Sequence, residues 1–176
     1  MAVKRLAPAG AITPTGPWSL GARAGDFVFV AGMRGIDPAT NTIVGSEEER
    51  IRRAYTNMKT IAESEGATLG DCVRLTVFVT DMKRLRPLVN KVQEELWAGG
   101  PYPPRTIVEV ARLNQDDIFE VEGTFLRPEN GLIFCHSGVV GDAVTFVTYI
   151  GIVAAAGSAA LKDETPWASR NSSTTK

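Results

Sequence analysis

The sequence predicts an α+β fold in which one mixed β-sheet carries two helices on one of its faces. The first observation is the order of segments, because strand-like and helix-like patterns alternate before two final strand-like segments. The second is the composition: 44% of the 176 residues are hydrophobic and 22% are charged, as in an ordinary domain with one core. This composition excludes a disordered or fibrous chain.

The first half of the chain predicts one strand and one helix. The apolar run FVFVAG at residues 27–32 is bounded by turn-forming residues, which predicts a strand buried on both faces. Ser46 and Glu49 form a capping box that begins a helix, and Gly66 ends it. The apolar stripe of this helix consists of Ile51, Ala54, Tyr55, Met58, Ile61 and Ala62.

The second half predicts three strands and another helix. Residues 73–79 alternate between apolar and polar and predict a strand, after which Asp81 caps a helix that ends near Gly99. After the extended PYPP segment, residues 105–113 and 118–125 both alternate and predict an antiparallel hairpin around NQDD. The apolar stripe of the second helix consists of Leu85, Leu88, Val89, Val92 and Leu96.

The sheet face away from the helices is expected to mix apolar and charged side chains. Alternate residues of a strand point to opposite faces, so the last strand places Phe119, Val121 and Phe125 on one face and Glu120, Glu122 and Thr124 on the other. The same parity groups Arg105, Ile107 and Glu109, and Phe78 also lies off the helix-facing side. Because no third helix is predicted to cover such a face, we expect it to be a subunit interface of a homo-oligomer.

Charge and residue counts exclude several classes of function. Nineteen Lys and Arg against 20 Asp and Glu give a net charge of −1, without the basic excess typical of nucleic-acid binding. His136 is the only histidine, which excludes sites that need two. Cys72 and Cys135 form no CxxC motif, which favours a reducing compartment. The sequence suggests no metal or organic cofactor.

The two ends of the sequence bear on localisation. The N-terminal segment lacks a long apolar stretch, so we expect a cytoplasmic protein; Lys4 and Arg5 before the first acid, Asp26, leave a mitochondrial location as the alternative. Residues 143–161 are 19 uncharged residues. Interspersed polar side chains favour a packed helix or strand pair over a membrane span, and the final SRNSSTTK is expected to be disordered.

Several segments together resemble the Rid family (reactive intermediate deaminases, YjgF-type). They are GPWSLGARAGDFVFVAGMRGIDPATN, NMKTIAESEGATLGDCVRLTVFVTDM, Val89-Asn90, PPRTIVEVARL and FEVEGTF, in family order within residues 13–128. The resemblance implies a chorismate-mutase-like α+β fold, a homotrimer and active sites in clefts between subunits. It leaves residues 1–12 as an N-terminal segment and 129–176 as a C-terminal extension, in which NGLIFCHSGVVG is either a degenerate second unit or an apolar packing extension.

Arg105 and Glu120 are the candidate catalytic residues. Arg105 starts a strand after a Pro-rich connection, and its planar fork matches a carboxylate, although an interface salt bridge would use the same residue. The resemblance implies that Arg105 binds the substrate carboxylate. A carboxylate can activate water for imine hydrolysis, and parity leaves Glu120 and Glu122 equivalent; the resemblance favours Glu120. It also places Asn90 and backbone groups near Gly32 and at Ile107 in the site.

The chain departs from the deaminase pattern at several pocket positions. Trp18 stands where those members typically have tyrosine, Ala31 where they have serine, and Ile107 where they have cysteine; Asn114 follows ARL where proline is usual. The three changes at Trp18, Ala31 and Ile107 make the expected pocket less polar. They favour a bulkier or aromatic substrate over the smallest imino acids.

The leading hypothesis is an enamine or imine deaminase that releases ammonia and a 2-oxo acid. Alternatives are a Rid paralogue that acts on a bulkier enamine in a biosynthetic or catabolic pathway, including cyclisation, and a non-catalytic trimer that binds a small carboxylate. A ribonuclease is the fourth hypothesis, and the near-zero net charge argues against it. The expected partners are therefore other copies of this chain and a small carboxylate, with neither nucleic acid nor membrane.

Overall fold

The computed structural model describes residues 2–127. The extension 129–176, with its uncharged segment, its resemblance to residues 25–35 and His136, lies outside the described residues. Within residues 2–127, no helix is long and apolar enough to cross a membrane.

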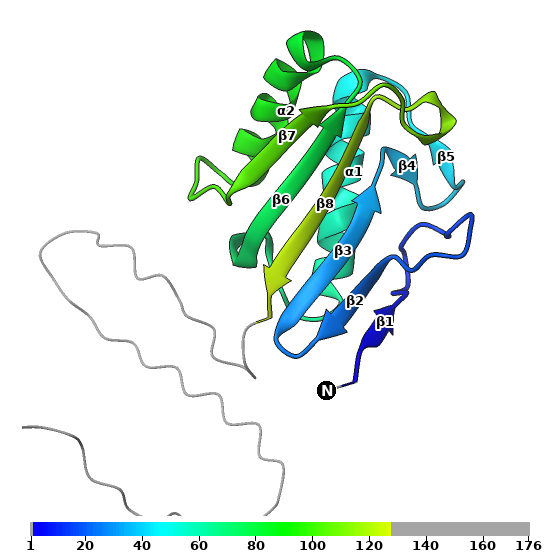
Figure 1. The fold of residues 1–176 in the computed structure, drawn as a ribbon, viewed down its shortest axis with the longest axis vertical. Helices are drawn as coiled ribbons and strands as arrows, with labels where there is room; N and C mark the ends of the chain where they lie inside the picture. The colour runs from blue at the N-terminus through cyan, green and yellow to red at the C-terminus, as the bar shows by residue number, and fades with distance from the viewer. Residues whose placement is uncertain (1, 128–176) are drawn as a thin grey trace, which may run out of the picture. The chain divides into compact units, whose positions relative to one another are not determined.

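The described chain forms a six-stranded mixed sheet with the order β1-β2-β3-β8-β6-β7 (Figure 1). All neighbouring strands are antiparallel except β6 and β7, which run parallel. A separate two-stranded ribbon of β4 and β5 follows β3. The strands are β1 (Lys4–Leu6), β2 (Gly21–Ala24), β3 (Phe27–Met33), β4 (Ile36–Asp37), β5 (Thr42–Ile43), β6 (Cys72–Val79), β7 (Arg105–Glu109) and β8 (Phe119–Leu126).

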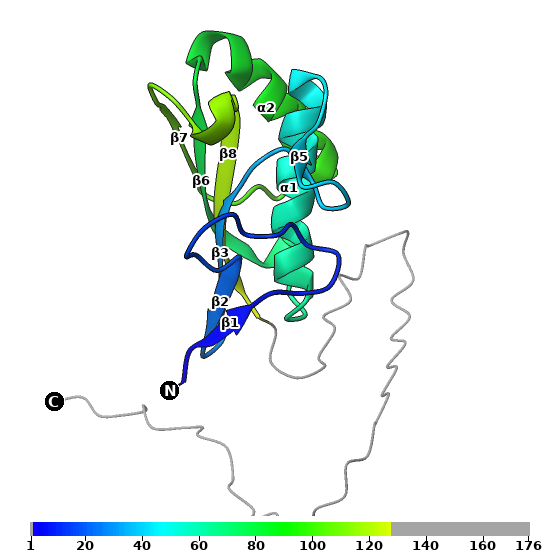
Figure 2. The same cartoon turned by 90° about the vertical axis from the view of Figure 1, so that its right-hand side faces the viewer.

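The two predicted helices both pack on one face of this sheet, as the edge-on view of Figure 2 shows. The first, α1 (Glu47–Glu63), begins at the predicted capping box, in which the Glu49 carboxylate accepts the Ser46 N–H at 2.7 Å. The second, α2 (Met82–Leu96), begins at Asp81, whose carboxylate accepts the Arg84 N–H. Two 3-10 turns, η1 (Leu69–Asp71) and η2 (Asn114–Asp116), precede β6 and β8.

The core lies between the helices and the sheet. The apolar stripe of α1 meets alternate residues of β8, and the Tyr55 ring lies 5.5 Å from the Phe119 ring, centre to centre. A Cβ at Gly123 would come within 2.9 Å of Met58 Sδ, so glycine lets α1 approach β8 closely. The close packing of α1 on β8 therefore depends on glycine at position 123.

The predicted hairpin of residues 105–113 and 118–125 is wrong. The first of these strands ends at Glu109, and β6 lies between β7 and β8, pairing with both. The segment β6-α2-β7 is a crossover unit, which requires parallel strands and places β7 at the sheet edge. Alternation showed that two strands exist, but it carries no information on which strand each one pairs with.

The expectation that β3 is buried on both faces is also wrong. Phe27 and Phe29 are 43% and 46% exposed, whereas Val28 and Val30 between them are buried. The cause is the one-sided placement of the helices, because no described element covers the opposite face. We call this opposite side the open face; it carries Phe27, Phe29, Phe78, Val108, Leu126, Glu120, Glu122 and Thr124.

The segment 1–12 contributes to the same sheet. Residues Lys4–Leu6 form β1, which pairs antiparallel with β2, and Leu6 and Ile12 are buried in the core. No periodicity signalled a strand of three residues.

Candidate active site

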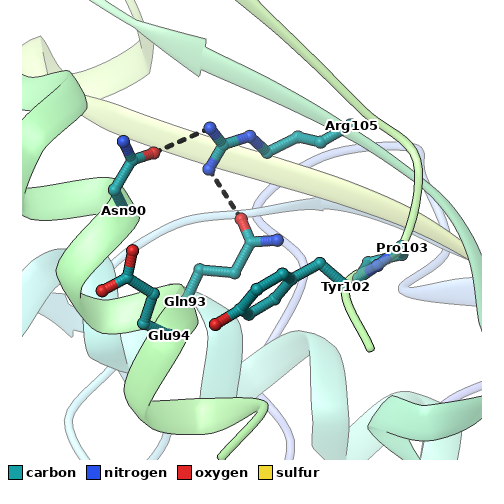
Figure 3. A pocket seen from close by; sticks show the side chains of 6 residues that line it. All are labelled: Asn90, Gln93, Glu94, Tyr102, Pro103 and Arg105. Carbon is teal, nitrogen blue, oxygen red and sulfur yellow. Dashed lines mark hydrogen bonds between the residues drawn. The ribbon is translucent and has the colours of Figure 1, made fainter. Parts of the chain in front are cut away.

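Arg105, at the start of β7, is held by two amide side chains of α2. Its Nη1 donates to Gln93 Oε1 at 2.7 Å and its Nη2 donates to Asn90 Oδ1 at 2.8 Å (Figure 3). The buried Tyr55 hydroxyl donates to the same Gln93 oxygen at 3.3 Å. Burial raises the pKa of Tyr55, so this hydroxyl keeps its proton and remains a donor. The guanidinium plane is thereby fixed before any ligand arrives.

Gln93 is a site residue that sequence reasoning missed. It is only 5% exposed and lies three residues after Asn90, so both amides project from the same side of α2. The signal was a polar residue beside the apolar stripe, which by itself is compatible with an ordinary solvent-facing position.

A pocket of about 350 Å³ opens beside this guanidinium. Two of the five N–H donors of an arginine are used by the amides, which leaves three that no described residue takes. Figure 3 shows the pocket between α2 and the segment that leads into β7. It is lined by Asn90, Gln93, Glu94, Tyr102, Pro103 and Arg105.

The Ile107 side chain does not line this pocket. It is half-buried and packs against the core, in register with Val77 of β6. The Ile107 backbone, in contrast, faces the outer edge of the sheet. Leu75 N–H donates to Pro104 O and Val110 N–H donates to Val79 O, so the residues at even positions of this segment form the hydrogen bonds to β6. Bonded residues alternate along a strand, so the Ile107 N–H points away from β6 at the sheet edge.

Glu120 lies on the open face and packs directly over Gly32. The residue is half-buried and pairs across the sheet with Phe78. A Cβ at Gly32 would overlap its carboxylate, so only glycine leaves room for the group. The register between β3 and β8 shifts between Val30 and Met33, so the backbone at Gly32 is not regularly paired with β8.

A second pocket, of about 270 Å³, surrounds the Glu120 carboxylate. Four predicted site residues meet in it, namely Trp18, Ala31, Gly32 and Glu120. Burial raises the pKa of Glu120; Arg34 opposes the rise, and Asp117 and Glu122 add to it. The full lining is Ile12, Trp18, Ala31, Gly32, Arg34, Ile36, Asn114 and Glu120.

Within one copy of the chain, Arg105 and Glu120 lie on opposite sides of the sheet. Arg105 is in register with the buried Leu75, on the helix side, whereas Glu120 is in register with Phe78 on the open face. The expectation that Arg105, Ile107 and Glu109 lie off the helix side is therefore wrong. The three side chains do share one face of β7, as predicted, but parallel pairing with β6 directs that face toward α2. The Glu109 carboxylate accepts the N–H of Met82 at the start of α2.

Comparison with known proteins identifies the family. The sequence model of the endoribonuclease L-PSP family matches residues 9–125, more than half of the chain. The chain belongs to this family, the Rid family of the sequence resemblance. A RutC family protein of Pyrococcus abyssi is 41% identical over 110 residues, which are 62% of this chain and 85% of that protein.

Two further relatives connect this Rid chain with named proteins. The 2-iminobutanoate/2-iminopropanoate deaminase of Salmonella typhimurium is 32% identical over 126 residues, 70% of this chain and 98% of that one. The structure of a probable translation initiation inhibitor from Rhodopseudomonas palustris is 55% identical, with a TM-score of 0.70, and the match covers 72% of this chain and 99% of that one. Two helices on a mixed sheet are thus the Rid fold.

Arg34 is the second residue of this Rid chain that sequence reasoning missed. It follows β3, is 8% exposed and lines the pocket of Glu120. Its only signal was a charged residue inside the segment GMRG, and nothing in the sequence indicates that this residue is buried. Among residues 2–127, no group of three or more His, Cys, Asp or Glu is placed to hold a metal ion.

Proposed function

We propose that this Rid-family chain is an enamine or imine deaminase, which hydrolyses a 2-imino or 2-enamino acid to a 2-oxo acid and ammonia. The observation that supports it most is the Arg105 guanidinium, which Asn90 and Gln93 fix at the wall of a pocket. A fixed guanidinium binds a planar carboxylate through paired hydrogen bonds without losing side-chain freedom. The outward Ile107 N–H adds a neutral donor at the same sheet edge.

The active site, in this proposal, forms between two copies of the chain. Arg105 and Glu120 of one copy lie in separate pockets on opposite sides of the sheet, so neither pocket holds both groups. Association through the open face, in a homotrimer, brings Arg105 of one copy to Glu120 of the next. The exposed Phe27, Phe29 and Leu126 give that face the apolar area that an interface needs.

Hydrolysis then proceeds in steps that follow from the two groups. Arg105 binds the substrate carboxylate, which places the adjacent imine carbon toward Glu120. The Glu120 carboxylate takes a proton from water while the water oxygen forms a bond to that carbon. Glu120 gives this proton to the imine nitrogen, so that a carbinolamine forms. Glu120 then takes the proton of the new hydroxyl and delivers it to the same nitrogen; the carbon–nitrogen bond breaks, the carbonyl forms, and ammonia leaves a 2-oxo acid behind.

The pocket around Glu120 favours a bulky or aromatic side chain on the substrate. Trp18, Ala31, Ile12 and Ile36 present apolar groups there, and Ala31 offers no hydroxyl. An apolar wall gains contact with a large hydrocarbon group and little with a methyl group. One copy of the chain supplies about 270 Å³ of this pocket, and in the proposed assembly the neighbouring copy supplies the wall that carries Arg105.

The test is release of ammonia and 2-oxo acid from imino acids that an amino-acid oxidase generates in place. Aliphatic and aromatic imines are compared for the wild type, Arg105→Ala and Glu120→Gln. We expect acceleration by the wild type, preference for aromatic imines, and loss of roughly 100-fold or more in each variant.

Two surface variants serve as matched controls. Arg86→Ala removes an exposed arginine of α2, and Glu63→Gln removes an exposed carboxylate of α1; both should keep wild-type rates. Wild-type protein that accelerates none of the imines contradicts the proposal. If Glu120→Gln then still binds 2-oxo acids and Arg105→Ala does not, the chain is a carboxylate-binding protein.

A further inference from the structure

Arg34 joins the end of β3 to the turn that precedes β8. Its Nη1 donates to the Asn114 carbonyl at 2.6 Å, and its Nη2 donates to Gln115 Oε1 at 3.0 Å. These residues are 80 positions apart in sequence, and the guanidinium is nearly buried where they meet. The arginine therefore holds two distant segments together at one point.

The turn that Arg34 holds has an unfavourable backbone. Gln115 and Asp116 have φ angles of 58° and 52°, in the left-handed region that non-glycine residues rarely adopt. Two such residues in succession persist only where surrounding contacts impose them. The two hydrogen bonds from Arg34, one of them to Gln115 itself, are contacts of this kind.

Asp117 extends the same cluster into the interior. It is 1% exposed, its Oδ1 accepts the Ile118 N–H at 2.8 Å, and its Oδ2 makes no hydrogen bond with the described residues. Arg34 Nη1 lies 3.9 Å from Oδ2, and Arg50 Nη1 lies 3.8 Å from Oδ1. Two arginines thus balance one buried carboxylate at the base of the turn.

We propose that Arg34 is a positioning residue, which holds the Asn114–Asp117 turn as one wall of the Glu120 pocket. Arg34 and Asn114 both line that pocket. Glu120 is the second residue of β8 and lies three positions after Asp117, so the turn leads directly into the strand that carries Glu120. Loss of the two hydrogen bonds would let the turn relax toward ordinary backbone angles and move the wall. This inference rests on the proposed deamination for its effect on rate, although its effect on the turn does not.

Arg34 also contributes charge next to Glu120. The charged groups around that carboxylate are Arg34 from the end of β3, Asp117 from the turn and Glu122 from β8 itself. Arg34 is the positive member of this set, so it favours the carboxylate form of Glu120. Without it the pKa of Glu120 rises, and the carboxylate needed to activate water appears only at higher pH.

Three variants separate the hydrogen bonds from the charge. Arg34→Met removes both, Arg34→Lys keeps the charge without the paired hydrogen bonds, and Gln115→Ala removes one acceptor from an exposed side chain. Arg53→Met on α1 is the matched control at a half-buried arginine outside this pocket. The measurements are kcat and KM across pH, and trypsin cleavage after Arg112, whose side chain is 82% exposed next to the turn.

We expect kcat to fall about 10- to 100-fold in Arg34→Met with little change in KM, as for a displaced catalytic group. The acidic limb of its pH profile should move to higher pH, whereas Arg34→Lys and Gln115→Ala should keep the wild-type limb. Cleavage after Arg112 should accelerate in Arg34→Met and Gln115→Ala. A purely structural arginine would lower the yield of folded protein without moving the limb.

The outcomes distinguish this inference from the proposed function. An active wild type with an unmoved limb and unchanged kcat in Arg34→Met overturns the inference and leaves deamination intact. A wild type inactive on every imine overturns the proposed function. The role of Arg34 in holding the turn is then tested only by the rate of trypsin cleavage after Arg112. Unchanged cleavage after Arg112 in both Arg34→Met and Gln115→Ala overturns the role of Arg34 in either case.

Discussion

Gly32 determines where the Glu120 carboxylate can lie. A Cβ at this position would overlap the carboxylate, so Gly32→Ala must push the Glu120 side chain out of its place. We expect the rate of imine hydrolysis to fall about 100-fold, because a misplacement of about 1 Å at a reacting group has an effect of that size. Steady-state kinetics on the best imine measures it, with circular dichroism to confirm the fold.

Gly70→Ala is the control for that change. Gly70 lies in η1, far along the chain, and a Cβ there would meet only the Thr68 hydroxyl at 3.4 Å. It should keep the wild-type rate. Equal rates for Gly32→Ala and the wild type would show that the position of the Glu120 carboxylate over Gly32 is irrelevant to the reaction.

Single residues of the site were predictable where a local pattern or motif marks them. Trp18, Ala31, Gly32 and Glu120 were selected from the sequence, and the structure brings them into one pocket. Gln93 and Arg34 were not, because their roles depend on partners 12 and 80 residues away. A polar residue on a helix or in a turn carries no sign of a distant partner.

At the level of elements, Asn57 fixes α1 to the chain that follows β3. This residue of α1 is 4% exposed, and its Nδ2 donates to the carbonyls of Arg34 and Ile36 at 3.1 and 2.7 Å. Asn57→Ala leaves both carbonyls without this donor, in the interior. We expect a loss of about 2 to 6 kcal/mol in the free energy of unfolding, since each of the two unsatisfied buried groups costs about 1 to 3 kcal/mol.

Denaturant titration of Asn57→Ala measures this loss, and Thr56→Ala provides the neighbouring control. The Thr56 hydroxyl donates to the Arg52 carbonyl within the same helix, a local bond that contributes little to helix stability. Thr56→Ala should therefore change the free energy of unfolding by less than about 1 kcal/mol. Similar losses in the two variants would contradict the anchoring role of Asn57.

The elements themselves were predictable to the extent that their signals are local. The Ser46–Glu49 capping box marks the start of α1, and Asp81 marks that of α2, because each signal involves residues within one turn of helix. Strand pairing was not predictable in the same way. The partner of β7 is β6, on the other side of a whole helix, and alternation reports only the two faces of a strand.

For the whole molecule, the separation of Arg105 and Glu120 has a consequence that mixing can measure. If each site takes Arg105 from one copy and Glu120 from the next, Arg105→Ala and Glu120→Gln chains complement each other in a mixed trimer. In a random one-to-one mixture each position holds the required copy half of the time, so about one quarter of the sites in a ring regain both groups. Each variant alone stays inactive.

Co-expression of the two chains in equal amounts, followed by purification on a tag that both chains carry, gives an unselected random mixture of assemblies, and ammonia release per site measures its activity. The matched mixture combines wild type with a chain that carries both substitutions, Arg105→Ala and Glu120→Gln. A site built within one copy predicts about half of the wild-type activity for this mixture and none for the single variants. A site built between copies predicts about one quarter of the wild-type activity for each of the two random mixtures, because every working site then needs a suitable chain at two neighbouring positions. Equal recovery in the two mixtures supports the shared site, whereas an inactive mixture of the single variants contradicts it.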